Sequence, residues 1–308
     1  LYPHRRVSDV QRRMMTTPVE SHVHAVAIDG TFDDCQTLVK GMFNDHAFRD
    51  RVSLSGVNSI NWARIVAQVT YYFAAATALG APHRPVTFAV PTGNFGDVFA
   101  GYVAKRMGLP VERLIIASNA NDILPRAFAS GVYDIRDVVA TSSPSMDIQI
   151  SSNFERFLFE AAGRDAATIR AQMGALQQSG RFEIGAALGP WREAFGAAAA
   201  SEDEVAAAMR RVHAECGYLM DPHTACGQVA LDTCGDADGS APSVLLSTAH
   251  PAKFPDAVQA ITGTRPALPA RLASLLDDPE RTELLRNDLG VVERFVESRA
   301  RGLREGAA

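Results

Sequence analysis

The sequence predicts an α/β fold in which an open, parallel-rich sheet is flanked by helices. Three stretches indicate this, because each places a short apolar, β-branched run directly before a helical period: residues 23–43, 86–107 and 113–130. A strand that feeds a helix is the unit from which parallel sheets are built. With 308 residues, the chain can form one large domain or two lobes that each have a core.

The first unit has a strand at residues 23–28 and a helix that begins near Thr31. Residues 58–61 then form a polar turn before a long helix. Residues 65–82 carry no charged side chain, but polar side chains and a glycine interrupt the apolar run. A buried core helix therefore fits this stretch better than a membrane span does.

The second unit combines a strand, a turn and a helix in an order that favours anion binding. Residues 86–90 are the strand, residues 91–97 are rich in turn formers, and residues 98–107 have the helical period. Unpaired backbone amides and the positive end of the helix dipole then point at one spot, which suits a phosphate. The spacing is neither GxGxxG nor GxxxxGK[ST], which argues against a dinucleotide cradle and a P-loop. From geometry alone, an ordinary βα turn is an equal alternative.

A second polar helix start follows the third strand–helix unit, residues 113–130. Ser152 and Asn153 precede an apolar helix, and they fit two interpretations. One is an N-cap for that helix, and the other is a second anion site of the same physical kind as the first. Arg156 likewise fits either a charge-assisted contact to such an anion or a surface salt bridge.

The chain from residue 201 onward contributes four further predictions. Residues 201–204 form a capping box that opens a helix, and Asp221-Pro222 starts another. Residues 243–248 predict a buried strand, and Thr248 lies at its carboxyl end, on the edge where open α/β sheets bind ligands. Residues 268–304 predict a charged, helical tail, to which we assign no chemistry.

Composition limits the classes of partner. The formal net charge is −5, with 47% hydrophobic and 21% charged residues, so nothing suggests binding to nucleic acid or to an anionic membrane. The four cysteines have no CxxC spacing, which indicates free thiols in a reducing cytoplasm. His22 and His24 have no third ligand nearby, so we predict no metal site.

Five blocks of the sequence, in order, resemble threonine synthases, which are pyridoxal-phosphate enzymes of fold type II (tryptophan synthase β-like). The blocks cover nearly the whole chain: VNSINW (57–62), TGNFGD (92–97) followed by FAGYVAKRMGLP, SSNFER (151–156), DPHTA (221–225) and STAHPAKFP (247–255). The resemblance implies residues 1–56 as the remainder of a smaller N-terminal lobe. Residues 57–308 are then the large lobe that binds the cofactor phosphate, with a helical insert and a helical tail.

The resemblance implies pyridoxal 5′-phosphate as the cofactor, and it carries two groups of contacts over to this chain. The phosphate loop supplies Gly93, Asn94, Phe95, Gly96 and Asp97, and Thr248 faces the ring nitrogen. Glycine lets the backbone approach the phosphate closely. A carboxylate beside a dianion is repelled, so we expect the Asp97 side chain to turn toward its own helix amides or another donor. Without the resemblance, Thr248 would be a strand-end hydroxyl that bonds to backbone.

On the substrate side, the resemblance implies Lys253, Ser152, Asn153, Arg156, Ser59 and Asn61. Helix capping alone is the other interpretation of Ser59 and Asn61. The chain has three lysines, of which Lys253 is our candidate for a cation that faces the substrate's phosphate. In the family the Schiff-base lysine lies upstream of the matched segment. We therefore expect no catalytic residue in this chain, which we interpret as a C-terminal piece of a longer protein.

The implied reaction converts O-phospho-L-homoserine and water to L-threonine and phosphate. The implied partner is thus a small phosphorylated amino acid, bound by a cytoplasmic protein that is a monomer or a homodimer. Two alternatives remain open. One is another enzyme of the same fold, either a threonine-synthase-like phospho-lyase or a serine/threonine dehydratase. The other is a non-catalytic fragment that keeps the fold.

Overall fold

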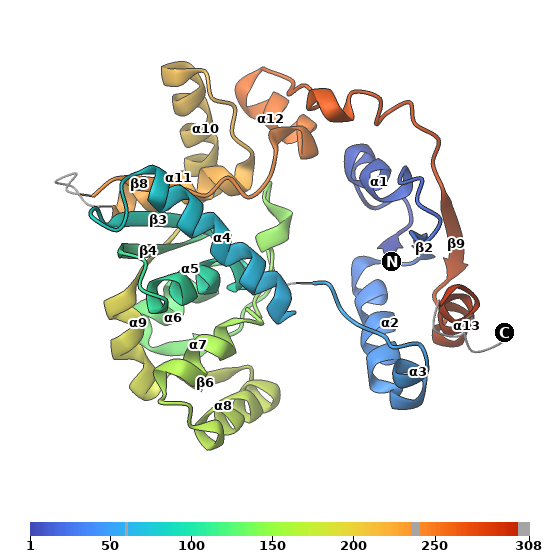
Figure 1. Ribbon diagram of the computed structural model, residues 1–308, viewed down its shortest axis with the longest axis horizontal. Coiled ribbons are helices and arrows are strands. Elements are labelled where there is room, and N and C mark those ends of the chain that lie inside the picture. The colour runs from blue at the N-terminus through green and yellow to red at the C-terminus, as the bar shows by residue number, and fades with distance from the viewer. Residues whose placement is uncertain (59–60, 236–240, 301–308) are drawn as a thin grey trace. The chain divides into compact units, whose positions relative to one another are not determined.

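The computed structural model describes residues 1–58, 61–235 and 241–300 of the chain. It divides into two compact units, whose helices and strands are shown in Figure 1. The smaller unit combines Leu1–Gly56 with Ala267–Ala308, and the larger unit is Val57–Pro266.

A parallel sheet forms the centre of the larger unit. Ala89 on an inner strand pairs with Ile115 on one side and with Leu245 on the other. Each ladder of this sheet is parallel, which confirms the predicted α/β class with a parallel-rich sheet. The strands lie in the order β7 (Phe195–Ala199), β4 (Val111–Ser118), β3 (Val86–Pro91) and β8 (Ser243–Leu245).

Helices cover both faces of this sheet. Successive side chains of β3 point to opposite faces and therefore enter two different cores. Phe88 and Val90 belong to a large apolar core that also contains side chains of α4 (Trp62–Ala78) and α5 (Gly96–Arg106). Ala89 belongs to a separate core, which it shares with Ala230 of α11 (Pro222–Cys234). The turns at the carboxyl ends of the strands are thus held between two packed layers.

Other elements of the larger unit surround this centre. A short antiparallel pair joins β5 (Val132–Asp134) to β6 (Arg181–Glu183). The predicted capping box is confirmed, because the Ser201 and Glu204 side chains each accept from the other's backbone amide at the start of α10. Further helices are α6 (Ile123–Ser130), α7 (Phe154–Ala161), α8 (Ala166–Ser179), α9 (Leu188–Ala194), α10 (Glu202–Cys216) and α12 (Pro255–Thr262), with 3₁₀ turns η1 (Pro144–Met146), η2 (Gly185–Ala187) and η3 (Pro251–Lys253).

The smaller unit has a parallel sheet of its own, in the order β1–β2–β9. Ile28, Phe48 and Val292 are fully buried in its core. The unit consists of β1 (Tyr2–Pro3), α1 (Asp9–Thr16), β2 (Ala25–Asp29), α2 (Phe32–Asn44), α3 (His46–Arg51), η4 (Ala270–Leu272), β9 (Thr282–Arg286) and α13 (Leu289–Arg299).

The tail differs from the prediction, which placed it in the large lobe as helix alone. β9 pairs in parallel with β2, with Ala27 opposite Leu284, and α13 contributes Val292 to the core of the smaller unit. The tail therefore completes the smaller unit. Its strand escaped prediction because only two apolar residues, Leu284 and Leu285, mark it in the sequence.

Two further predictions need correction. α4 is not buried all round: Ile65 and Tyr72 are fully buried, whereas Val66 and Tyr71 are about half exposed. Since α4 covers one face of a layer, it buries one stripe of side chains. The strand predicted at residues 243–248 is the three-residue β8, and it is only partly buried because it is an edge strand of its sheet.

Within the described ranges, no helix is both long and apolar enough to cross a membrane. No group of three or more histidine, cysteine, aspartate or glutamate side chains in those ranges is placed to hold a metal ion. All four cysteines are free thiols, of which Cys35 and Cys226 are buried.

Candidate active site

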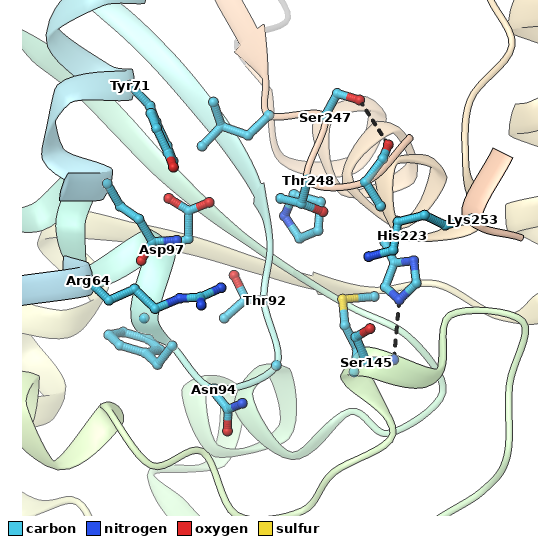
Figure 2. A pocket seen from close by; sticks show the side chains of 18 residues that line it. Arg64, Tyr71, Thr92, Asn94, Asp97, Ser145, His223, Ser247, Thr248 and Lys253 are labelled. Atoms are coloured by element: carbon cyan, nitrogen blue, oxygen red, sulfur yellow. Dashed lines mark hydrogen bonds between the residues drawn. The ribbon is translucent and has the colours of Figure 1, made fainter. Parts of the chain in front are cut away.

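A cavity of about 590 Å³ opens in the larger unit and collects residues from segments far apart in the sequence (Figure 2). Its walls come from α4, the turn between β3 and α5, the η1 turn, the start of α11 and the segment after β8. The turns after β3 and β8 leave the carboxyl ends of two paired parallel strands. Open α/β sheets bind ligands at this edge.

The turn after β3 presents a row of backbone amides to the cavity. Thr92 still belongs to the sheet, because its amide donates to the carbonyl oxygen of Ala117 at 2.7 Å. From Gly93 to Asp97, no backbone amide donates to another group in the described part of the chain. Since α5 begins at Gly96, the positive end of its dipole adds to these amides. Amides arranged in this way form an anion-binding site.

Phe95 fixes the shape of this turn. Its backbone is left-handed, with φ at 62°, which is a costly conformation for a residue with a large side chain. Its ring is 99% buried and packs against Phe154 at 5.1 Å and Phe195 at 5.7 Å between ring centroids. Burial of the aromatic ring therefore offsets the backbone strain and holds the amides in place.

A neighbouring segment leaves little room for a side chain at Gly93. A Cβ there would lie 3.0 Å from the carbonyl oxygen of Ser145, whereas one on Gly96 would make an ordinary contact, 3.4 Å from the side-chain nitrogen of Asn153. The sequence predicts that these glycines allow close approach of a phosphate. The structure shows that Gly93 also admits the protein's own η1 turn.

Asp97 turns away from the row of amides and toward α4. The Tyr72 hydroxyl lies 2.7 Å from the Asp97 carbonyl oxygen and 3.2 Å from a carboxylate oxygen, and it donates to both. Burial raises the pKa of Asp97 from its ordinary 3.8 to about 6, although the Tyr72 hydrogen bond and the nearby charge of Arg64 oppose the rise. The donor that we expected for Asp97 is thus Tyr72.

Thr248 lines the same cavity as the amide turn. The backbone leading to it continues the sheet, since the amide of Leu246 donates to the carbonyl oxygen of Ala89 at 3.0 Å. The Thr248 side chain is exposed, and its hydroxyl has no hydrogen bond within the described residues. The two segments that we predicted to hold opposite ends of a ligand therefore form walls of one pocket.

Of the three lysines, Lys253 alone lines this cavity. It ends the η3 turn, and its Nζ lies 5.7 Å from the ring centroid of Phe254. Lys40 lies in α2 of the smaller unit, and Lys105 lies in α5 with its Nζ 3.5 Å from the carbonyl oxygen of Glu112. The position of Lys253 agrees with a cation that faces an anionic ligand.

Two predicted substrate residues contact the turn from outside the cavity, and a third contacts one of these two. The Asn153 side chain donates to the Asn94 carbonyl oxygen at 3.1 Å, and the Ser152 hydroxyl donates to the Asn94 side-chain oxygen at 3.3 Å. Arg156 in turn donates to the Asn153 side-chain oxygen at 3.0 Å. None of the three lines the cavity, so the structure does not support a direct ligand contact for them. Asn153 makes no side-chain cap bond either, which corrects the capping interpretation.

The remaining two substrate candidates belong to the segment before α4. The Asn61 side chain accepts from the Ala63 amide at 2.9 Å, so it caps the helix and does not line the cavity. This favours the capping interpretation for Asn61. Ser59 lies outside the described residues.

A polar stripe on α4 was not predicted from the sequence. Arg64, Gln68 and Tyr71 lie on one face of this helix and line the cavity. Arg64 is exposed, and Figure 2 shows its side chain directed into the pocket beside Asp97. The spacing of four and three residues was readable from the sequence, because it places side chains on one helix face.

A buried carboxylate–imidazole pair, which was also missed, lies at the start of α11. The Asp221 carboxylate lies 2.8 Å from Nδ1 of His223, and both side chains are almost fully buried. Nε2 of His223 accepts from the Ser145 amide at 3.2 Å. The predicted helix start is confirmed, since Asp221 is the N-cap and Pro222 is the first helical residue.

Comparison with known proteins identifies the relationship. A family model described as "Threonine synthase, C-terminal" matches residues 224–296. The threonine synthase of Pseudomonas aeruginosa is 49% identical over 96% of this chain and 63% of its own length. A crystal structure of pyridoxal-phosphate-bound threonine synthase from Brucella melitensis is 58% identical, with a TM-score of 0.93 over 97% of this chain and 64% of that one. The chain is a homologue of threonine synthases.

Two further relatives agree with this assignment. The threonine synthase of Saccharomyces cerevisiae is 39% identical over 96% of this chain. The crystal structure of threonine synthase from yeast superposes with a TM-score of 0.88 at 38% identity. This chain spans about 63% of the length of the curated threonine synthases that it matches.

Proposed function

We propose that this chain forms the part of a threonine synthase that binds pyridoxal phosphate. The observation that carries the proposal is the row of unpaired amides from Gly93 to Asp97, which begins α5 and shares its pocket with Thr248. The crystal structure of the relative from Brucella melitensis, which is 58% identical to this chain, contains bound pyridoxal phosphate.

The residues present fit each end of the cofactor. The amides of the turn and the helix dipole would hold a phosphate dianion, and the Asp97 carboxylate is turned away from it toward Tyr72. The Thr248 hydroxyl can donate to an unprotonated ring nitrogen, but it cannot keep that nitrogen protonated as a carboxylate would. The bound cofactor would then act as a mild electron sink, which suits elimination and replacement.

Two cations on the walls favour a substrate that carries its own phosphate. The Arg64 guanidinium comes from α4 and the Lys253 ammonium from η3, and both line the cavity. Guanidinium groups bind phosphate in a bidentate manner, and lysine adds a point charge. We therefore infer that Arg64 and Lys253 orient O-phospho-L-homoserine, and that the assembled enzyme converts this substrate and water to L-threonine and phosphate.

Binding of pyridoxal phosphate to the purified chain tests the first part of the proposal. Titration with the cofactor, monitored by tryptophan fluorescence, should show saturable binding. Inorganic phosphate should compete with the cofactor for this site. Reduction with borohydride should leave no stable adduct on Lys253, because we assign this side chain to the substrate. Saturable binding that phosphate does not affect, or an adduct on Lys253, would contradict the assignment.

The substrate class requires a second measurement. Binding of O-phospho-L-homoserine to the cofactor-loaded chain should be tighter than binding of O-phospho-L-serine or of unphosphorylated L-homoserine. Preference for unphosphorylated serine or threonine would instead favour a dehydratase. A chain that binds the cofactor but none of these amino acids would favour a non-catalytic role.

A further inference from the structure

The start of α11 holds a histidine whose two ring nitrogens are both engaged. Nε2 of His223 lies 3.2 Å from the Ser145 amide nitrogen, which can only donate. Nε2 must therefore carry the lone pair, and the ring proton of the neutral imidazole must be on Nδ1. Nδ1 lies 2.8 Å from a carboxylate oxygen of Asp221, which accepts that proton's hydrogen bond. The pair fixes one tautomer of His223.

The surroundings leave this imidazole little freedom. The same Asp221 oxygen accepts from the His223 backbone amide at 2.9 Å, and the other carboxylate oxygen accepts from the Thr224 hydroxyl. The ring of Phe254 packs on the imidazole, with 4.8 Å between ring centroids. His223 is 97% buried and Asp221 is completely buried. A buried, fully bonded pair of this kind keeps one rotamer.

The hydrogen bond of His223 connects it to the amide turn through one intermediate, Ser145, and both residues line the cavity. Ser145 lies in η1, and its carbonyl oxygen is the atom that a Cβ on Gly93 would approach to 3.0 Å. The carbonyl group of Ser145 therefore packs against Gly93, while the amide of the same residue is held by the imidazole. A shift of η1 would remove the surface on which the turn rests.

The same helix start also contacts the opposite wall. The Thr224 hydroxyl lies 3.4 Å from the Ser247 hydroxyl, directly before Thr248 in the sequence. The start of α11 thus contacts both η1, which packs on the phosphate-binding turn, and the segment that we assign to the ring nitrogen of the cofactor.

We propose that His223 is a positioning residue for the phosphate-binding turn, which it supports through the backbone of Ser145 in the tautomer set by Asp221. The proposal deepens the proposed function, since it takes pyridoxal phosphate as the ligand of the turn. His223 is not a proton carrier in this arrangement, because its basic nitrogen already accepts from the backbone. Its role is to keep the amides of residues 93–97 at the spacing that a phosphate requires.

Two substitutions test separately the hydrogen bonds made by the two ring nitrogens of His223. In His223→Gln, the side-chain oxygen can reach the position of Nε2 and still accept from Ser145. In His223→Asn, the shorter amide can replace Nδ1 as a donor to Asp221, but it does not reach Ser145. His83→Gln makes the same chemical change at an exposed histidine outside the cavity and serves as the control.

Two measurements on the full chain report the effect of each substitution, one on the hydrogen bond to Ser145 and one on cofactor binding. Hydrogen exchange of the Ser145 amide, measured by NMR without cofactor, reports the bond itself. The dissociation constant for pyridoxal phosphate and the ³¹P chemical shift of its bound phosphate report the shape of the turn. We expect His223→Asn to exchange the Ser145 amide about tenfold faster and to weaken cofactor binding by about tenfold, as loss of one buried hydrogen bond predicts. His223→Gln should retain protection at Ser145 and most of the affinity.

The outcomes distinguish this proposal from the proposed function. If His223→Asn leaves the Ser145 exchange rate and the ³¹P shift unchanged, the positioning role is wrong even when the cofactor binds. If His223→Asn does not fold, His223→Gln decides alone, because loss of Ser145 protection in that variant would overturn the role of the Nε2 acceptor. If the unsubstituted chain binds no pyridoxal phosphate, the proposed function fails, while the exchange measurement still tests the contact to Ser145.

Discussion

Substitution of Gly93 by alanine is the sharpest test of the phosphate-binding turn. The added Cβ would lie 3.0 Å from the Ser145 carbonyl oxygen and 3.3 Å from the Met146 Cα, both of which are backbone atoms. Side chains cannot relieve these contacts by changing rotamer, so the turn or η1 must shift. Overpacking of this kind costs about 1–3 kcal/mol, which corresponds to about a 5- to 150-fold change in an equilibrium constant.

The assay is a titration of Gly93→Ala with pyridoxal phosphate, with urea unfolding of the same sample. We expect weaker cofactor binding by about tenfold or more, because the amides at residues 93–97 move relative to one another. The matched control is Gly174→Ala in the interior of α8, where a Cβ meets no atom within 4 Å and should leave binding unchanged. If Gly93→Ala binds the cofactor as tightly as the unsubstituted chain, the turn does not hold the phosphate.

Three further predictions concern other residues of the pocket. Because the pKa of Asp97 is raised to about 6 in the folded protein, its protonated form adds stability below about pH 4, and this contribution of about 2–3 kcal/mol disappears as pH rises through 6. Urea unfolding across this range should show the loss, and Asp97→Asn should abolish it. Arg64→Gln should weaken binding of O-phospho-L-homoserine about tenfold by calorimetry, whereas Arg64→Lys should keep part of the affinity. Phe95→Ala should lower the free energy of unfolding by about 3–5 kcal/mol in urea, since it empties a fully buried aromatic site.

One control variant and two contradicting outcomes accompany these three predictions. Arg210→Gln removes an exposed arginine from α10 that does not line the cavity, so substrate binding should be unaffected. Stability of Asp97→Asn that still changes with pH between 4 and 6, in parallel with the unsubstituted chain, would assign the titration to another group. A Phe95→Ala variant as stable as the original would mean that the aromatic cluster does not hold the left-handed turn.

Local patterns in the sequence predicted the β3–α5 unit well. Residues 86–107 contain a strand, a turn and a helix whose apolar spacings are short-range signals, and the structure has β3 and α5 there. The left-handed backbone of Phe95 was not predictable, because phenylalanine rarely adopts it and the packing that supports it comes from Phe154 and Phe195.

Contacts between distant segments explain the remaining differences. The resemblance assigned Ser152 and Asn153 to the substrate, but the sequence could not show that they contact Asn94 from outside the cavity. The spacing of Arg64, Gln68 and Tyr71 predicts a shared face of α4, but only the packing of α4 beside the turn shows that this face lines the cavity. The position of β9 depends on pairing with β2 across more than two hundred residues, for which no local pattern exists.

The pairing of β9 with β2 has a consequence for synthesis of the chain on the ribosome. Residues 57–266 contain every strand of the larger unit, so that unit can reach its final form while the tail is still being made. In the smaller unit, by contrast, β2 can pair with β1 on one side but has no partner on its other side until Thr282–Arg286 emerges. Until then one side of β2 has unpaired backbone groups, and nascent chains are therefore exposed to aggregation through this strand.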